Sequence, residues 1–154
     1  MESNQTKKII ISFAAIISVA VLGSVFVRLG MDWFNGLIKP SQWVPNIVIP
    51  IVWTAIYIAF AVINFIWLKN GDIPKSTVIL MIINGALNVL WCLVFFTLKQ
   101  LLLGDIVILL NLIAGFLLVA DIFKNKKLFG YILIIYPVWL SIATTLNLAL
   151  WILN

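Results

Sequence analysis

Apolar residues run through this sequence in five long stretches, which short polar or proline-containing segments separate. Each stretch has about the 20 residues that a helix needs to cross the hydrocarbon core of a bilayer. None of them shows the roughly ten-residue alternating segments of a membrane β-barrel. The pattern therefore predicts an all-α integral membrane protein with five transmembrane helices. The predicted helices cover residues 9–27, 47–68, 77–98, 101–123 and 128–153.

The connection after the first predicted helix is the only long one, over about residues 28–46. Its aromatic and proline residues are Trp33, Phe34, Pro40, Trp43 and Pro45. Long connections in compact domains are usually functional or disordered, and this one is too aromatic for a flexible linker. We expect it to fold as a cap over one end of a single five-helix domain that covers residues 1–154.

The composition excludes several classes of protein. Hydrophobic residues make up 64% of the 154 positions and charged residues 10%, whereas soluble domains have roughly 45–50% and about 25%. A soluble globular enzyme and a disordered chain are therefore both excluded. The chain has no histidine and one cysteine, Cys92, so histidine-based zinc or nucleophile chemistry and an intrachain disulfide are excluded too. No metal site is predicted.

The net charge is +5, but the cationic residues are scattered between the apolar stretches, so we expect no nucleic-acid partner. The side of the membrane that holds the N-terminus receives seven of them and the opposite side three. The seven are Lys7, Lys8, Lys69, Lys75, Lys124, Lys126 and Lys127, and the three are Arg28, Lys39 and Lys99. Because cytoplasmic loops are enriched in Lys and Arg, we predict a cytoplasmic N-terminus. The abundance of Ile, Lys and Asn indicates an AT-rich bacterial source and hence the plasma membrane.

Three predicted helices each carry polar and aromatic residues on one face, at helical spacing. In helix 47–68 these are Trp53, Tyr57, Phe60, Asn64 and Trp67; in helix 77–98, Asn84, Asn88, Trp91 and Phe95; in helix 128–153, Tyr136, Trp139, Ala143, Asn147 and Trp151. Polar groups in hydrocarbon normally turn toward protein. We therefore expect the three faces to point toward one another.

These faces have two interpretations. Asn64, Asn84 and Asn111 suit hydrogen bonds between helices. Asn88 and Asn147 share a face with Trp91 and Trp139, and for them a ligand pocket is an equal alternative. Large rings with few amides are typical of a site for a flat apolar ligand, either a planar aromatic or a sterol-like molecule. No stripe of charged residues indicates an ion path.

The segment from Trp33 to Tyr57 reads WFNGLIKPSQWVPNIVIPIVWTAIY, and it resembles a family signature of the form W-[YF]-x-x-L-x-K-P followed by P-x-V-W-T-x-x-Y. The stretches LNVLWCLVFF from Leu87 and WLSIATTLN from Trp139 add two further motifs in the same order. Together they are similar to the tryptophan-rich sensory protein family (TspO/MBR), which includes the translocator protein. The resemblance spans nearly the whole chain.

This resemblance implies a five-helix homodimer whose pocket binds porphyrins, such as protoporphyrin IX or haem, as ligands, with no obligatory cofactor. It also implies binding of isoquinoline carboxamides and benzodiazepines. The implied ligand-binding residues are Trp33, Phe34, Pro45, Tyr57, Asn88, Trp91, Phe95, Ala143 and Asn147. Some bacterial relatives degrade protoporphyrin with light and oxygen, and the tryptophans linked to that reaction correspond here to Trp53 and Trp139.

The sequence departs from the family pattern at several positions. Val44 stands where the first of two adjacent prolines is usual, and Ile47 where a tryptophan often follows. Neither a tyrosine nor a basic residue follows Asn147, so sterol binding through that motif is not expected. A porphyrin receptor or sensor is thus the leading hypothesis, and a light-dependent degradative activity is the second. A transporter of tetrapyrroles or other hydrophobic metabolites comes last, because the chain has neither internal repeats nor coupling acids.

Overall fold

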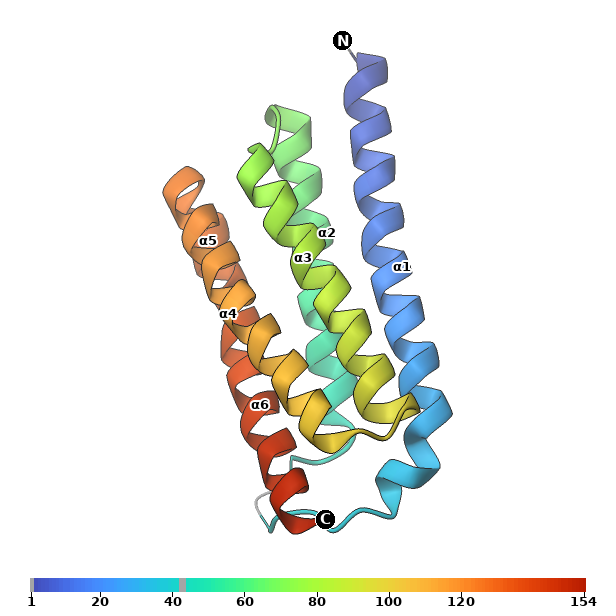
Figure 1. Ribbon diagram of the computed structural model, residues 1–154. Coiled ribbons are helices and arrows are strands. Elements are labelled where there is room, and N and C mark those ends of the chain that lie inside the picture. The colour runs from blue at the N-terminus through green and yellow to red at the C-terminus, as the bar shows by residue number, and fades with distance from the viewer. Residues whose placement is uncertain (1, 42–43) are drawn as a thin grey trace.

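The structure is a computed structural model that describes residues 2–41 and 44–154, and it is a bundle of antiparallel helices (Figure 1). Trp43, which we placed in the capping loop, lies outside the described residues. The elements are α1 (Glu2–Asn35), α2 (Val48–Asn70), α3 (Lys75–Cys92), the π-helix η1 (Leu93–Thr97), α4 (Leu101–Asn125), α5 (Lys127–Leu133) and α6 (Ile135–Leu153). They form five segments long and apolar enough to cross a membrane, which confirms the predicted fold class.

Helix α1 is much longer than predicted. Its 34 residues span about 51 Å at 1.5 Å per residue, well beyond the roughly 30 Å of a hydrocarbon core. Hydropathy delimits only the apolar part, over residues 9–27, and does not detect helical turns that continue into the interface. As a result Trp33 and Phe34 lie in the last turn of α1 rather than in the loop, and the connection to α2 shrinks to residues 36–47.

The third span ends in a π-helix rather than as the regular helix predicted to residue 98. The amides of Leu98 and Gln100 donate to the carbonyls of Leu93 and Val94, at 2.9 and 3.1 Å. The wider turn lets the adjacent rings of Phe95 and Phe96 both be buried. π-Helical turns occur frequently at functional sites.

The fifth span is two helices, whereas the sequence predicted one continuous helix over 128–153. It is interrupted at Ile134, between α5 and α6. Pro137 lies three residues later; it has no N–H to donate, and its ring would clash with the carbonyl of Leu133 in a continuous helix. The interruption is therefore a local consequence of this proline.

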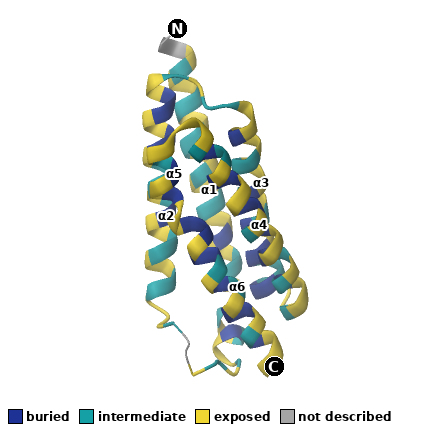
Figure 2. Ribbon diagram, turned by 90° about the vertical axis from the view of Figure 1, so that its left-hand side faces the viewer, coloured by how far each residue is buried: buried dark blue, intermediate teal, exposed yellow. Residues whose placement is uncertain are grey.

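The two ends of the bundle differ in what they hold. The N-terminus, the turn between α2 and α3, and the turn between α4 and α5 lie at one end, and the C-terminus and the described loop residues 36–41 and 44–47 lie at the other (Figure 1). We call these the N-terminal end and the loop end. Helix α4 packs between α3 and α6, and the buried positions in Figure 2 follow these helices.

Helix α1 packs on α2 and α3 but buries only Gly23, Gly30 and Phe34 among its described residues. Toward the loop end it is held closely, since a Cβ on Gly30 would overlap the Phe96 carbonyl. There the Thr97 hydroxyl also donates to the Phe26 carbonyl at 3.0 Å. The other half of α1 lies against a cavity.

Candidate ligand-binding cavity

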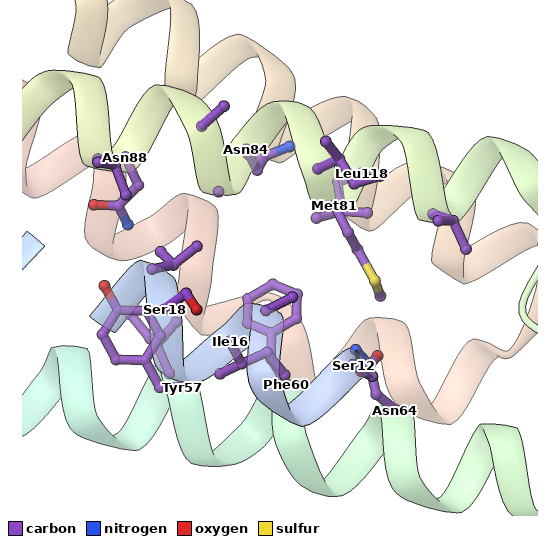
Figure 3. A pocket seen from close by; sticks show the side chains of 18 of the residues that line it. Ser12, Ile16, Ser18, Tyr57, Phe60, Asn64, Met81, Asn84, Asn88 and Leu118 are labelled. Atoms are coloured by element: carbon purple, nitrogen blue, oxygen red, sulfur yellow. Dashed lines mark hydrogen bonds between the residues drawn. The ribbon is translucent and has the colours of Figure 1, made fainter. Parts of the chain in front are cut away.

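A cavity of about 1060 Å³ lies between α1, α2 and α3, and Leu118 of α4 and Tyr136 of α6 complete its wall (Figure 3). Ligand pockets are usually about 300–1,000 Å³ and mostly apolar with a few placed polar groups. This wall has that character. Its polar or charged side chains include Lys8, Ser12, Ser18, Tyr57, Asn64, Asp72, Asn84, Asn88 and Tyr136.

Toward the loop end, the wall is aromatic with one amide. Tyr57 on α2 points toward Asn88 on α3 across the cavity (Figure 3). Trp53, one turn before Tyr57, stacks on its ring with centroids 5.9 Å apart and planes at 27°. Because Trp53 and Tyr57 expose ring surface beside an amide, this part of the cavity offers both a stacking surface and a hydrogen-bonding group.

The middle of the wall is tied together by a hydrogen-bond network between α3, α4 and α6. The Tyr136 hydroxyl lies 3.2 Å from Oδ1 of both Asn84 and Asn111, to which it donates. The Asn84 amide donates to the Ala114 carbonyl at 3.1 Å. The prediction that Asn84 and Asn111 bond between helices is confirmed.

The same holds for Asn64, whose amide on α2 donates to the Ser12 hydroxyl on α1 at 2.9 Å. Asn64 is buried, and its Oδ1 has no partner among the described residues. Ser12 and Asn64 lie side by side at the cavity edge in Figure 3. This edge therefore has hydrogen-bonding capacity that the protein itself does not use.

A chain of aromatic contacts runs from the end of α1 to Trp53 at the cavity wall. Trp33 contacts Phe95, Phe95 stacks on Trp91, and Trp91 stacks on Trp53, with centroids 5.9, 6.0 and 6.4 Å apart. We call Trp33, Phe95, Trp91 and Trp53 the aromatic ladder. Each such pair contributes about 0.5–1.5 kcal/mol beyond burial, so the ladder supports Trp53 from behind at this end of the cavity.

The predicted site residues divide into three groups by position. Trp53, Tyr57 and Asn88 line the cavity. Trp33, Phe34, Trp91 and Phe95 pack together behind Trp53, and Trp139 and Ala143 belong to the same buried cluster. Asn147 is buried on α6, and Pro45 is exposed on the connection before α2. The ligand contacts assigned to all of these residues stay predictions.

The sequence reasoning missed the contribution of α1. Ser12, Ala15, Ile16 and Val19 line the cavity, although the first helix carries no aromatic stripe. Lys8 and Ser12 are four residues apart and so share a helical face. That spacing was the available signal that Lys8 and Ser12 act together. That their face of α1 borders a cavity follows only from the positions of α2 and α3.

The N-terminal end of the cavity is charged. Lys8 and Asp72 are the charged residues among its described lining, and the Lys8 ammonium lies 2.6 Å from an Asp72 carboxylate oxygen. Asp72 is in the turn between α2 and α3, so the pair joins that turn to α1. The hydrogen bond from Lys8 and its positive charge hold the pKa of Asp72 below its usual value, which keeps the carboxylate ionised.

The chain matches one protein family over almost its whole length. The sequence profile of the TspO/MBR family matches residues 11–152. A tryptophan-rich protein TspO of Archaeoglobus fulgidus is 30% identical over 96% of this chain and 97% of its own. The human translocator protein is 31% identical over 84% and 80%, and the protein CrtK of Rhodobacter capsulatus is 27% identical over 79% and 78%.

Proposed function

Since the chain belongs to the TspO/MBR family, we propose that it is a membrane receptor that binds porphyrins and similar flat hydrophobic ligands. The proposed ligands are protoporphyrin IX and haem. The site is the cavity between α1, α2 and α3. The observation that carries the proposal is this large cavity, whose wall includes the rings of Trp53, Tyr57, Phe60 and Tyr136.

The chemistry of the wall supports a ligand of this kind. A flat macrocycle gains affinity by stacking and by burial of its apolar faces. Pyrrole N–H groups need hydrogen-bond acceptors, and the unpartnered Oδ1 of Asn64 is one. The only charged groups among the described lining residues are Lys8 and Asp72, at one end of the cavity, so a small ion is a poorer match than a large apolar molecule.

The test is a titration of the purified protein with protoporphyrin IX, followed by quenching of tryptophan fluorescence. Ala15→Phe places a ring at a cavity-lining position of α1, whereas Ala14→Phe adds the same ring at a neighbouring exposed position outside the lining. We expect saturable quenching that Ala15→Phe weakens at least tenfold and Ala14→Phe leaves within twofold. Absence of saturable quenching in the unmodified protein would refute the proposal.

A second activity is favoured by the position of one tryptophan. Trp53 lines the cavity and stacks on both Tyr57 and Trp91, so a bound porphyrin would lie beside it. We propose that illumination of the bound porphyrin in the presence of oxygen leads to its oxidative degradation, with participation of Trp53 and Trp139. The reaction would rest on the photochemistry of the ligand itself.

The membrane setting and the assembly are also proposals. Seven lysines at the N-terminal end against three cations toward the loop end support a cytoplasmic N-terminal end in a bacterial plasma membrane. The family resemblance supports a homodimer. Analytical ultracentrifugation in matched-density detergent checks the dimer. A protein mass of one chain throughout the micromolar range of protein concentration would exclude it.

A further inference from the structure

The cavity has a chemical polarity along its length. At the loop end its wall includes Trp53 of the aromatic ladder, and at the N-terminal end its wall carries Lys8 and Asp72. The two side chains are 38% and 63% exposed, so this end is in contact with water. A ligand that fills the cavity would therefore have one edge in an apolar, aromatic environment and the opposite edge beside charges.

Lys8 can donate more hydrogen bonds than the one it makes. An ammonium group has three N–H donors, and the structure assigns one of them to Asp72. One turn further into the cavity on the same face of α1, Ser12 accepts from Asn64. The Ser12 hydroxyl proton has no acceptor among the described residues. Lys8 and Ser12 thus present two donors to one edge of the cavity.

Asp72 competes with any anionic ligand for Lys8, and its own interaction with Lys8 is weak. It sits in a turn and is more exposed than Lys8, and exposed ion pairs contribute little to stability. Lysines outnumber acidic residues at this end of the bundle, and Lys7, Lys69 and Lys75 are close in sequence to the pair, although Asp121 also lies there, bonded to Thr77. An anionic group that reaches the mouth from inside the cavity can displace Asp72 into water.

We propose that Lys8 is the anchor for a carboxylate at the edge of an otherwise flat apolar ligand, so that the cavity selects hydrophobic anions. The ligand then lies with its carboxylate at the N-terminal end and its opposite edge against Trp53. This inference rests on the proposed function and adds to it the charge class and the orientation of the ligand. A carboxylate deeper in the cavity would lose its hydration without a cationic partner, which is costly.

The test compares protoporphyrin IX, which has two carboxylates, with its dimethyl ester, which has none. Both are titrated into the full chain in nanodiscs of phosphatidylcholine, with tryptophan quenching as the readout. For Lys8→Gln we expect about tenfold weaker binding of the acid, the size of one charge-assisted hydrogen bond, and less than a twofold change for the ester. For Asp72→Asn we expect tighter binding of the acid, because its competitor for Lys8 is gone.

Lys7→Gln is the matched control, since Lys7 is exposed, adjacent in sequence and outside the cavity lining. It should change neither affinity by more than twofold. Equal effects of Lys8→Gln on acid and ester, or no effect on either, would overturn the anchor while leaving porphyrin binding intact. Failure of both ligands to bind the unmodified protein would instead refute the proposed function. Circular dichroism checks that each variant keeps its helical content.

The phosphate of an acidic phospholipid carries the same kind of charge and can reach the cavity from the bilayer. The titrations are therefore repeated in nanodiscs that contain phosphatidylglycerol. If the carboxylate of the porphyrin is the anion that Lys8 recognises, the tenfold effect of Lys8→Gln persists. If phosphatidylglycerol abolishes that effect by occupying Lys8, the lipid headgroup is the ligand and the assignment to a carboxylate is overturned.

Discussion

The hydroxyl of Tyr136 on α6 lies 3.2 Å from Oδ1 of Asn84 on α3, and this contact joins two helices at the wall of the cavity. Asn84 is itself tied to α4 through the Ala114 carbonyl. The wall is thus braced by side chains that are buried in apolar surroundings, where an unpaired polar group is costly. The ligand site and the stability of the bundle depend on the same residues.

Removal of this hydroxyl should destabilise the protein. In Tyr136→Phe the ring and its edge contact with Phe60 remain, but Asn84 and Asn111 lose their shared donor. We expect a loss of about 1–2 kcal/mol, between the average interhelical hydrogen bond and the cost of an unsatisfied buried group. The measurement is reversible unfolding in mixed micelles. Tyr131→Phe is the control, because Tyr131 is 66% exposed; equal stability of the two variants would contradict the prediction.

Gly30 should tolerate no side chain. A Cβ at this position would overlap the Phe96 carbonyl, whereas a Cβ at Gly23 would meet only the Cys92 sulfur at an ordinary 3.4 Å. We expect Gly30→Ala to cost about 3 kcal/mol, the upper part of the range for overpacking, and Gly23→Ala to cost less than about 1 kcal/mol. Thermal unfolding in detergent compares the two. A Gly30→Ala protein as stable as Gly23→Ala would show that α1 and η1 are less closely packed.

Lys99 adopts a left-handed conformation, with φ of 57°, in the turn between η1 and α4. A residue with a Cβ is strained there by roughly 1–2 kcal/mol relative to glycine. Lys99→Gly should therefore raise the midpoint of thermal unfolding. The same change at Lys124, in the last turn of α4, should lower it because glycine weakens a helix by about 1 kcal/mol. A lower midpoint for both variants would refute the argument.

Trp53 should matter for chemistry more than for binding. Trp53→Phe keeps an aromatic ring at the cavity wall, so we expect affinity for protoporphyrin IX to fall by less than about fivefold, which is about 1 kcal/mol. Under illumination in air, loss of the porphyrin absorption bands should slow strongly in Trp53→Phe and less in Trp139→Phe, because Trp139 is not among the described lining residues. Trp67→Phe is the control, since Trp67 packs on Phe129 in a separate cluster. Bleaching that is unchanged in the Trp53 and Trp139 double variant would exclude a role for these residues.

The proposed orientation predicts which end of the bundle a membrane-impermeant maleimide can reach. Cys92 is buried, so background labelling should be low. In intact cells Ser41→Cys, at the loop end, should be labelled, whereas Asn125→Cys, at the N-terminal end, should require permeabilised membranes. Labelling of Asn125→Cys alone in intact cells would reverse the orientation.

The sequence by itself determined the five spans and the helix faces that carry the polar groups. Both follow from the free energy of transfer between water and hydrocarbon, which each residue contributes locally. For the same reason the pairing of Asn64 and Asn84 with other helices was predictable: a buried amide must find a partner. Pro137 likewise contained the signal for the interruption before α6, although the interpretation of one continuous helix overlooked it.

Only the tertiary structure decided where the empty space lies. A cavity is what remains when side chains from several helices fail to fill the volume between them, and no local pattern contains that information. The packing of the helices placed Tyr57 and Asn88 on the cavity wall and Trp91 and Ala143 in the core. It also brought Lys8 to Asp72, 64 positions away in the chain. The positions that border the cavity were thus set by packing between distant residues, which hydropathy does not measure.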